Sequence, residues 1–304
     1  MLLDIVICTY NRGNYLSKCL ESLLNQVQSF ENVGLFVVDN NSTDNTKKVV
    51  EGFQQKVTKV RYVSCLKQGL GFARNKAIEE CNAEWLAFID DDAYAEKNWL
   101  ENILRIIHEG KFDAFGGVYY PWYAEGKVPW FKDCYETNDT WMPPGDEFRL
   151  TQGYFSGGNS VFNVGKLRAA GGFPVGIGMN GNFVGYGEEV ATQRTMAING
   201  SRLGFSRRLI IHHLVPMRKQ RWQWAWKRSF ASGRDFWAIY SKETTRENLF
   251  FYIKSSLFNT FRVTAMSLKL FLSGNHNFKC LLYESGKFAY ISGLIFGYCQ
   301  MEKL

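Results

Sequence analysis

Four short apolar segments lie in the N-terminal third of the chain, and each is followed by polar residues and then by a stretch with helical periodicity. The segments are Asp4–Thr9, Leu35–Val38, Val60–Ser64 and Trp85–Ile89. Strands separated by helices pair in parallel, so the pattern predicts an α/β fold. Ligands of such sheets bind at the carboxyl ends of the strands. The polar residues after these segments are therefore the first candidates for a functional site.

Three consecutive aspartates, Asp90, Asp91 and Asp92, come directly after the fourth segment. Close carboxylates near a protein surface repel one another by roughly 1 kcal/mol or more per pair, so the cluster needs a compensating cation. Carboxylate oxygens are the ligands that Mg²⁺ and Mn²⁺ prefer. The sequence therefore indicates a divalent metal site, and the alternative is a solvated loop that caps the next helix.

Two further charged residues lie close in sequence to the ends of predicted strands. Asp39 follows the second segment, where a carboxylate can accept hydrogen bonds from a nucleoside, and Arg74 begins a helix after a glycine-rich turn. A guanidinium beside the N-terminus of a helix can bind phosphate or a base. Taken singly, Asp39 could shape only its own turn, and Arg74 could pair with a neighbouring acid. Together with Thr9 and the aspartates, they predict one crevice at the strand ends.

The pattern becomes less regular after Phe112. Residues 121–187 are rich in Gly, Trp, Pro and Asn, which indicates long binding loops. A helix is predicted over Glu188–Asn199 and one more strand over Leu209–Ile211. The longest uncharged stretch, residues 169–187, contains seven glycines and one proline. A membrane-spanning helix needs about 20 predominantly apolar residues, so none is expected.

The net charge differs between the first 200 residues and the rest of the chain. Residues 1–200 contain 19 Lys and Arg against 24 Asp and Glu, whereas residues 201–304 contain 17 against 5. From Arg221 onward, cations alternate with aromatic and apolar runs, which is typical of helices on an anionic membrane surface. A helical extension packed on the preceding domain, or a dimer interface, is the alternative. Nucleic-acid binding is not favoured, because the cations are spread among long apolar runs.

Seven cysteines are dispersed without a Cys-x-x-Cys pair, so the sequence predicts neither a zinc site nor a disulfide framework. A reducing cytoplasm is the simpler expectation. The first residues also lack the positive region and the long apolar core of a signal peptide.

Seven motifs follow one another along the chain. They are VICTYNR (6–12), VVDNNSTDNT (37–46), GLGFARN (69–75), FIDDD (88–92), SGGNSVF (156–162), GGF (171–173) and GYGEEVATQR (185–194). In this order they resemble the motifs of family 2 glycosyltransferases of the GT-A fold, over about residues 1–215. The resemblance implies a Rossmann-like α/β fold, with a mixed sheet flanked by helices and a C-terminal helical extension.

The resemblance also implies how the chain is divided. Residues 1–217 would form the GT-A catalytic domain, and residues 218–304 the basic aromatic extension. Within the catalytic domain, residues 1–110 would be the nucleotide-binding half, and residues 111–217 the half that binds the donor sugar and the acceptor.

Roles for individual residues follow from the same resemblance. Contacts to the donor nucleotide are implied for Thr9, Arg12, Asp39, Arg74, Asp90 and Asp91. Ligation of Mn²⁺ or Mg²⁺ is implied for Asp92, Asp90 and His212, with His213 the less favoured of the two histidines. The pocket for the donor sugar and the acceptor would be lined by Gly157, Gly158 and Asn159.

A catalytic base is the remaining requirement, because the acceptor hydroxyl must lose its proton as it attacks the donor sugar. The family places this base at the second acid of a Gly-acid-acid element, which maps to Glu189. The family usually has Asp there, and a misplacement of roughly 1 Å in an active site can cost on the order of 10²-fold in rate. Glu188 is the substitute base. The alternative is that both acids only complement the dipole of the helix that they begin.

These observations predict an inverting, metal-dependent glycosyltransferase. It would move a sugar from a nucleotide-diphosphate donor, with UDP favoured, to a saccharide or lipid-linked saccharide in cell-surface polysaccharide synthesis. We expect it in the cytoplasm, peripheral on the inner face of the cell membrane, with no nucleic-acid partner. A non-catalytic nucleotide-sugar- or carbohydrate-binding protein of the same fold is the alternative. The complete sets of aspartates and glutamates favour the enzyme, because a degenerate site would have lost acids.

Overall fold

The computed structural model describes residues 1–57, 59–151, 154–181, 183–240, 254 and 285–301. Its strands are β1 (Leu3–Thr9), β2 (Val33–Asp39), β3 (Val60–Ser64), β4 (Trp85–Ile89), β5 (Ala93–Ala95), β6 (Ala114–Trp122), β7 (Glu147–Arg149), β8 (Asn159–Asn163) and β9 (Leu203–Leu214). Its α-helices are α1 (Gly13–Gln28), α2 (Thr46–Gln54), α3 (Leu70–Glu80), α4 (Trp99–Glu109), α5 (Val164–Ala169), α6 (Glu188–Ile198), α7 (Trp222–Tyr240) and α10 (Lys287–Met301). Two short 3₁₀ helices cover Asp133–Tyr135 and Asp139–Trp141.

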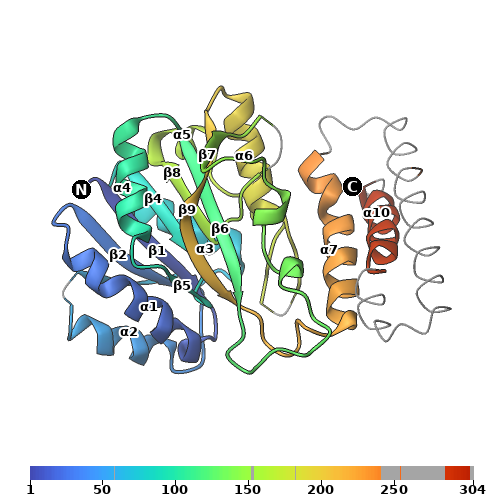
Figure 1. The fold of residues 1–304 in the computed structure, drawn as a ribbon, viewed down its shortest axis with the longest axis horizontal. Coiled ribbons are helices and arrows are strands. Elements are labelled where there is room, and N and C mark those ends of the chain that lie inside the picture. Colours follow the sequence, from blue (N-terminus) through green and yellow to red (C-terminus); the bar gives the residue numbers. More distant parts are fainter. Residues whose placement is uncertain (58, 152–153, 182, 241–253, 255–284, 302–304) are drawn as a thin grey trace. The chain divides into compact units, whose positions relative to one another are not determined.

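All the described strands belong to one mixed sheet. Its order is β3-β2-β1-β4-β8-β6-β9-β5, and β7 pairs with β9 beside this path. β1 pairs in parallel with β2 and β4, and β2 pairs in parallel with β3. β8 then runs antiparallel to both of its neighbours. Helices lie on both faces of the sheet (Figure 1), which confirms the predicted α/β architecture.

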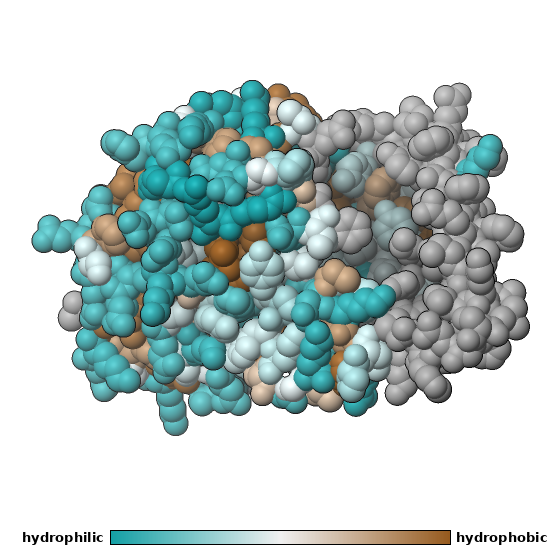
Figure 2. Space-filling model, in the orientation of Figure 1, coloured by the Kyte–Doolittle hydropathy of each residue, from teal (hydrophilic) through white to brown (hydrophobic). Residues whose placement is uncertain are grey.

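The sheet buries apolar residues on both faces. Along β1, Ile5 and Ile7 belong to a cluster completed by α1, α2 and α4, whereas Val6 belongs to a cluster completed by α3, α5 and α6. Burial on both faces explains why these strands appear in the sequence as continuous apolar runs. The outer sides of α1, α2 and α4 are mostly hydrophilic in the view of Figure 2.

The structure contains strands that the sequence pattern did not predict, and β6 and β9 show why. β6 contains Gly116 and Gly117, which weaken a strand signal. Both glycines are required, because a Cβ at Gly116 would overlap Phe155 and one at Gly117 would overlap the carbonyl of Leu209. β9 was predicted only over Leu209–Ile211, since charged residues precede that segment, yet it spans 12 residues. The predicted helix at Glu188 is confirmed as α6.

The chain divides into two compact units. The first contains Met1–Trp122, Asp133–Gly176 and Glu188–Leu214, and the second contains Tyr123–Lys132, Ile177–Gly187 and the chain from Val215 onward. This division differs from the expected boundary at residue 217. Hydrogen bonds explain the difference within the second unit: the backbone N–H of Tyr186 donates to Asp235 at 2.9 Å, and Arg234 donates to the carbonyl of Val184 at 2.9 Å.

Helices α7 and α10 pack closely within the second unit. A Cβ at Gly233 of α7 would overlap the carbonyl of Tyr290, and one at Gly293 of α10 would overlap the carbonyl of Phe230. The indole N–H of Trp237 donates to the carbonyl of Leu294 at 2.7 Å. No helix in the described ranges is long and apolar enough to cross a membrane. The apolar segment 249–272 of the predicted extension lies outside the described residues, apart from residue 254.

The side chain of Asn159, at the start of β8, forms hydrogen bonds to β6, β9 and α4. Its Nδ2 donates to the carbonyls of Val118 and Leu209, both at 2.9 Å, and its Oδ1 accepts from the indole of Trp99 at 2.9 Å. The register of β6 and β9 shifts between Gly117 and Val118, and the Asn159 amide bonds to both strands there. Asn159 is fully buried. The structure therefore places it in the core, in contrast to the expectation that it lines a sugar pocket.

Replacing Asn159 with Ala is expected to lower the free energy of unfolding by about 2 kcal/mol or more, because it leaves buried polar groups without partners. Urea unfolding followed by circular dichroism measures this loss. The exposed Asn82 provides the matched control, since its replacement with Ala should change stability by less than about 0.5 kcal/mol. Equal, small effects of both substitutions would contradict the assigned role.

Candidate active site

The carboxyl ends of β1, β2 and β4 meet at one edge of the sheet. β1 and β2 are in register from Leu3 with Val33 to Thr9 with Asp39, so their last residues are neighbours. β4 lies on the other side of β1 and leads directly into the three aspartates. Parallel pairing therefore brings together the polar residues that are far apart in the sequence.

Asp91 and Asp92 are both buried, and Asp91 bonds to the end of β1. Its Oδ2 accepts a hydrogen bond from the hydroxyl of Thr9 at 2.7 Å, and its Oδ1 accepts one from Nη1 of Arg12 at 2.9 Å. Burial raises the pKa of the Asp91 carboxyl, and the charge of Arg12 opposes that rise. Asp91 thus anchors the aspartate turn to β1, and its carboxylate is already bonded to Thr9 and Arg12.

Arg12 neutralises the crowded carboxylates. Its Nη1 lies 2.9 Å from Asp91 Oδ1 and 2.8 Å from Asp92 Oδ2, and its side chain is about 31% exposed. These two carboxylates raise the pKa of Arg12. The resemblance implied a contact between Arg12 and the nucleotide, whereas in this structure the guanidinium bonds to the aspartates.

Asp90, Asp92 and His213 form a group that fits a divalent cation. One ligand atom from each residue lies within 4.8 Å of the others. Nε2 of His213 is 3.2 Å from Asp92 Oδ1 and 3.9 Å from Asp90 Oδ2. Two carboxylates and one imidazole are donors that Mn²⁺ accepts, and two carboxylates also suit Mg²⁺.

The structure places His213, rather than the expected His212, with the aspartates. In the ladder of β5 and β9, Ala93 pairs with His213 and Tyr94 pairs with His212. Neighbouring side chains of a strand point to opposite faces, so only one of the two histidines can face the aspartates. Nε2 of His212 lies instead 3.1 Å from a carboxylate oxygen of Glu96, and its ring stacks on that of Tyr94.

Asp39 is the last residue of β2 and pairs with Thr9 at the end of β1. Its Oδ1 accepts from the backbone N–H of Ser42 at 2.9 Å, and its Oδ2 accepts from the hydroxyl of Tyr62 at 2.7 Å.

The loops after β1 and β2 are hydrogen-bonded to each other, since the side-chain oxygen of Asn11 accepts from the backbone N–H of Thr43 at 2.7 Å. Asn11 has a φ of 52°, a left-handed conformation in a non-glycine residue, which is a form of strain that concentrates at functional sites.

Two adjacent glycines allow charged side chains to lie directly against the backbone. A Cβ at Gly158 would overlap the carboxylate of Asp90, and a Cβ at Gly157 would overlap the guanidinium of Arg74. The backbone N–H of Asp90 also donates to the carbonyl of Gly158 at 3.2 Å. The absence of a Cβ at both glycines therefore leaves room for the Asp90 carboxylate and the Arg74 guanidinium at these positions.

Arg74 and Glu188 form a buried ion pair. Nη1 of Arg74 lies 2.8 Å from Oε1 of Glu188, and both side chains are about 5% exposed or less. Burial and the charge of the adjacent Glu189 raise the pKa of Glu188, and Arg74 opposes that rise. Glu189 is only partly buried. Of the two acids, Glu189 therefore offers the more accessible carboxylate.

A family model described as glycosyl transferase family 2 matches residues 4–169, which is more than half of the chain. The chain belongs to this family. Among solved structures, it is similar to the mannosyltransferase PcManGT from Pyrobaculum calidifontis, determined with GDP-Man and Mn²⁺. That likeness has a TM-score of 0.67 at 17% identity and covers 96% of this chain and 85% of the other. The predicted family and GT-A fold are thus confirmed.

Two curated relatives differ in how much of the chain they match. The succinoglycan biosynthesis protein ExoM from Rhizobium meliloti is 26% identical over 237 residues, which are 76% of this chain and 73% of ExoM. The glycosyltransferase GlyA from Streptococcus pneumoniae serotype 4 is 30% identical over 124 residues, which are 40% of this chain. The match spans only 18% of GlyA, so the similarity concerns one part of that protein.

Replacing Gly158 with Ala is expected to displace the Asp90 carboxylate and to weaken Mn²⁺ binding on the order of tenfold, as loss of ligand orientation does in other sites. Isothermal titration of the full chain with Mn²⁺ measures the change. The control is Gly176→Ala, because no atom lies within 4 Å of a Cβ built at Gly176. Equal Mn²⁺ affinity of the two variants would show that Gly158 does not position Asp90.

Proposed function

We propose that the protein is an inverting glycosyltransferase that uses a nucleotide-diphosphate sugar, with UDP as the favoured nucleotide. The acceptor is a saccharide or a lipid-linked saccharide, and the process is cell-surface polysaccharide synthesis. The observation that carries this proposal is the group of Asp90, Asp92 and His213 beside the strand ends that carry Thr9 and Asp39. Membership of family 2 and similarity to a succinoglycan biosynthesis protein support it.

The donor would bind along the carboxyl edge of the sheet. In this proposal Asp39 accepts hydrogen bonds from the nucleoside, because its carboxylate oxygens have lone pairs beyond those used by Ser42 and Tyr62. Asp90, Asp92 and His213 would hold Mn²⁺ or Mg²⁺. When bound there, the cation supplies Lewis-acid stabilisation of the charge that develops on the departing diphosphate.

The acceptor hydroxyl needs a base, and Glu189 is the proposed one. Its neighbour Glu188 is buried against Arg74, so Glu188 serves to hold that guanidinium in place. Arg74 in turn presents positive charge close to Gly157, where it can stabilise an anionic leaving group. One carboxylate base with no covalent intermediate gives inversion at the anomeric carbon.

Asp92→Asn and Glu189→Gln are expected to affect different steps. The first should reduce both transfer and donor hydrolysis by on the order of 10²-fold or more, since it weakens metal-assisted departure of the diphosphate. The second should reduce transfer by on the order of 10²-fold but leave binding of the donor nucleotide with Mn²⁺ unchanged. Release of the nucleotide from a panel of nucleotide sugars, with and without acceptor, measures transfer and hydrolysis. Isothermal titration of both variants with the donor nucleotide and Mn²⁺ measures binding.

Undiminished transfer by either variant would refute the proposed mechanism. Donor binding without any release of nucleotide, by the unaltered protein and across the panel, would identify a non-catalytic nucleotide-sugar-binding protein instead.

We also propose contact with the inner face of the cell membrane through α7 and the residues before it. Trp222 and Trp226 lie on one side of α7 with ring centroids 6.0 Å apart, and Arg218 lies over the ring of Trp224. Indole rings and cations are the side chains that favour the headgroup region of a bilayer. The exposed cation Lys227 lies on the same helix.

Replacing both Arg218 and Lys227 with Ala should weaken binding to vesicles that contain anionic phospholipid by about tenfold or more, because each cation near such a surface contributes about 1 kcal/mol. Co-sedimentation at low and high salt measures the effect. Replacing Lys48 and Lys56 with Ala removes the same charge from exposed positions in the first unit and should leave binding unchanged. Equal binding by all three proteins would refute membrane contact through α7.

A further inference from the structure

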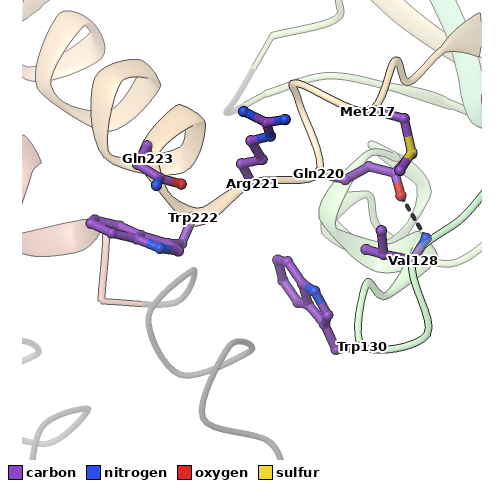
Figure 3. A pocket seen from close by; sticks show the side chains of 7 residues that line it. All are labelled: Val128, Trp130, Met217, Gln220, Arg221, Trp222 and Gln223. Carbon is purple, nitrogen blue, oxygen red and sulfur yellow. Dashed lines mark hydrogen bonds between the residues drawn. The ribbon is translucent and has the colours of Figure 1, made fainter.

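A pocket of about 350 Å³ lies within the second unit. It is lined by Val128 and Trp130 from the loop after β6, by Met217 and Gln220 after β9, and by residues at the start of α7 (Figure 3). Pockets that bind small molecules usually have volumes of about 300–1,000 Å³, so this one can hold a single small ring or chain segment.

Gln220 fixes the shape of this pocket. Its side chain is buried, and its Oε1 accepts from the backbone N–H of Val128 at 2.8 Å, as drawn in Figure 3. Its Nε2 donates to the carbonyls of Gly126 at 2.9 Å and Val215 at 3.2 Å. One side chain thus fastens the loop that carries Trp130 to the segment that precedes Trp222. The pocket is therefore formed before any ligand binds.

The lining combines two indole rings with polar side chains. Trp130 and Trp222 come from these two different segments, and Arg221 and Gln223 flank Trp222 in the sequence. An indole face is a flat apolar surface against which the C–H face of a pyranose ring can pack. The guanidinium of Arg221 and the amide of Gln223 are both exposed and can bond to hydroxyl groups.

We propose that this pocket binds a pyranose ring of the acceptor saccharide. The inference rests on the proposed function, because it assumes that the protein acts on a saccharide. An alkyl chain would leave the polar groups of Arg221 and Gln223 unused, and a phosphate group would leave both indole faces unused. A pyranose offers C–H faces that can pack on an indole and hydroxyl groups that can bond to polar side chains. The pocket residues also follow soon after His213 in the sequence, at the end of the strand that carries it.

Binding of methyl glycosides tests this assignment without any donor or enzymatic turnover. The probes are the methyl glycosides of glucose, galactose and N-acetylglucosamine at millimolar concentration, observed by saturation-transfer difference NMR with the full chain. We expect transfer to the ring C–H protons of at least one probe, lost in Trp130→Ala and Trp222→Ala and partly kept in Trp222→Phe. Trp224→Ala is the matched control, since Trp224 lies on the same helix outside the pocket.

An acceptor-concentration series provides a second measurement. With a transferred acceptor, Trp222→Ala should raise the acceptor KM by about tenfold, which corresponds to about 1.4 kcal/mol. Donor hydrolysis should remain unchanged. Thermal denaturation of each variant shows whether it is folded, and Trp222→Phe retains the ring in case the Ala variant is unfolded.

The outcomes separate this inference from the proposed function. Absence of saturation transfer for every probe, or equal transfer in all variants, would overturn the pocket assignment. Unchanged glycoside signals in Trp222→Ala would also overturn it, whether or not that variant loses vesicle binding, because Trp222 lies on the helix proposed to contact the membrane. Tryptophan-dependent glycoside binding together with undiminished transfer by Asp92→Asn would support the pocket and refute the proposed metal-dependent mechanism.

Discussion

Mutual repulsion among Asp90, Asp91 and Asp92 is the constraint that the surrounding structure must satisfy. Each carboxylate is given a different electrostatic environment. Asp91 is buried against Thr9, and Arg12 bridges Asp91 and Asp92 with contacts of 2.9 and 2.8 Å. Asp90 and the second oxygen of Asp92 are left facing His213. The result is a pair of acids with one imidazole, held at the end of a buried strand.

A second charged pair, Arg74 with Glu188, lies near the aspartates, since Arg74 and Asp90 lie against the adjacent glycines Gly157 and Gly158. Arg74 and Glu188 are buried together, and removal of one partner from such a pair typically costs about 3–5 kcal/mol because a charge is left unpaired. Because Arg74 pairs with only one of the two adjacent glutamates, Glu188 and Glu189 have different roles in the proposal. Glu188 is bound to Arg74, whereas Glu189 keeps a more accessible carboxylate for the proposed proton transfer.

The sequence predicted the features that depend on local pattern. The strands before Thr9, Asp39 and Asp90 were recognisable as apolar runs, and their parallel pairing brings their ends together. His213 was not preferred over His212, because the face to which each points depends on the pairing of β9 with β5. That pairing cannot be derived from neighbouring residues alone.

The position of Asn159 and the composition of the second unit also depend on contacts between residues that are far apart in the sequence. Asn159 occurs in a motif that suggested sugar contacts, yet its amide bonds to two other strands where their register shifts. The second unit combines Gln220 with a loop more than ninety positions earlier. Such long-range hydrogen bonds leave no periodic signal in the sequence, so neither the pocket nor the division of the chain was predictable from it.

In the proposed mechanism, Asp90, Asp92 and His213 hold a divalent cation next to the donor diphosphate. Anomalous diffraction from crystals of the full chain grown with Mn²⁺ and UDP locates this cation. We expect a manganese peak within coordination distance of all three side chains and of the diphosphate oxygens. A peak bound to His212 and Glu96, or one with no contact to Asp92, would contradict this mechanism.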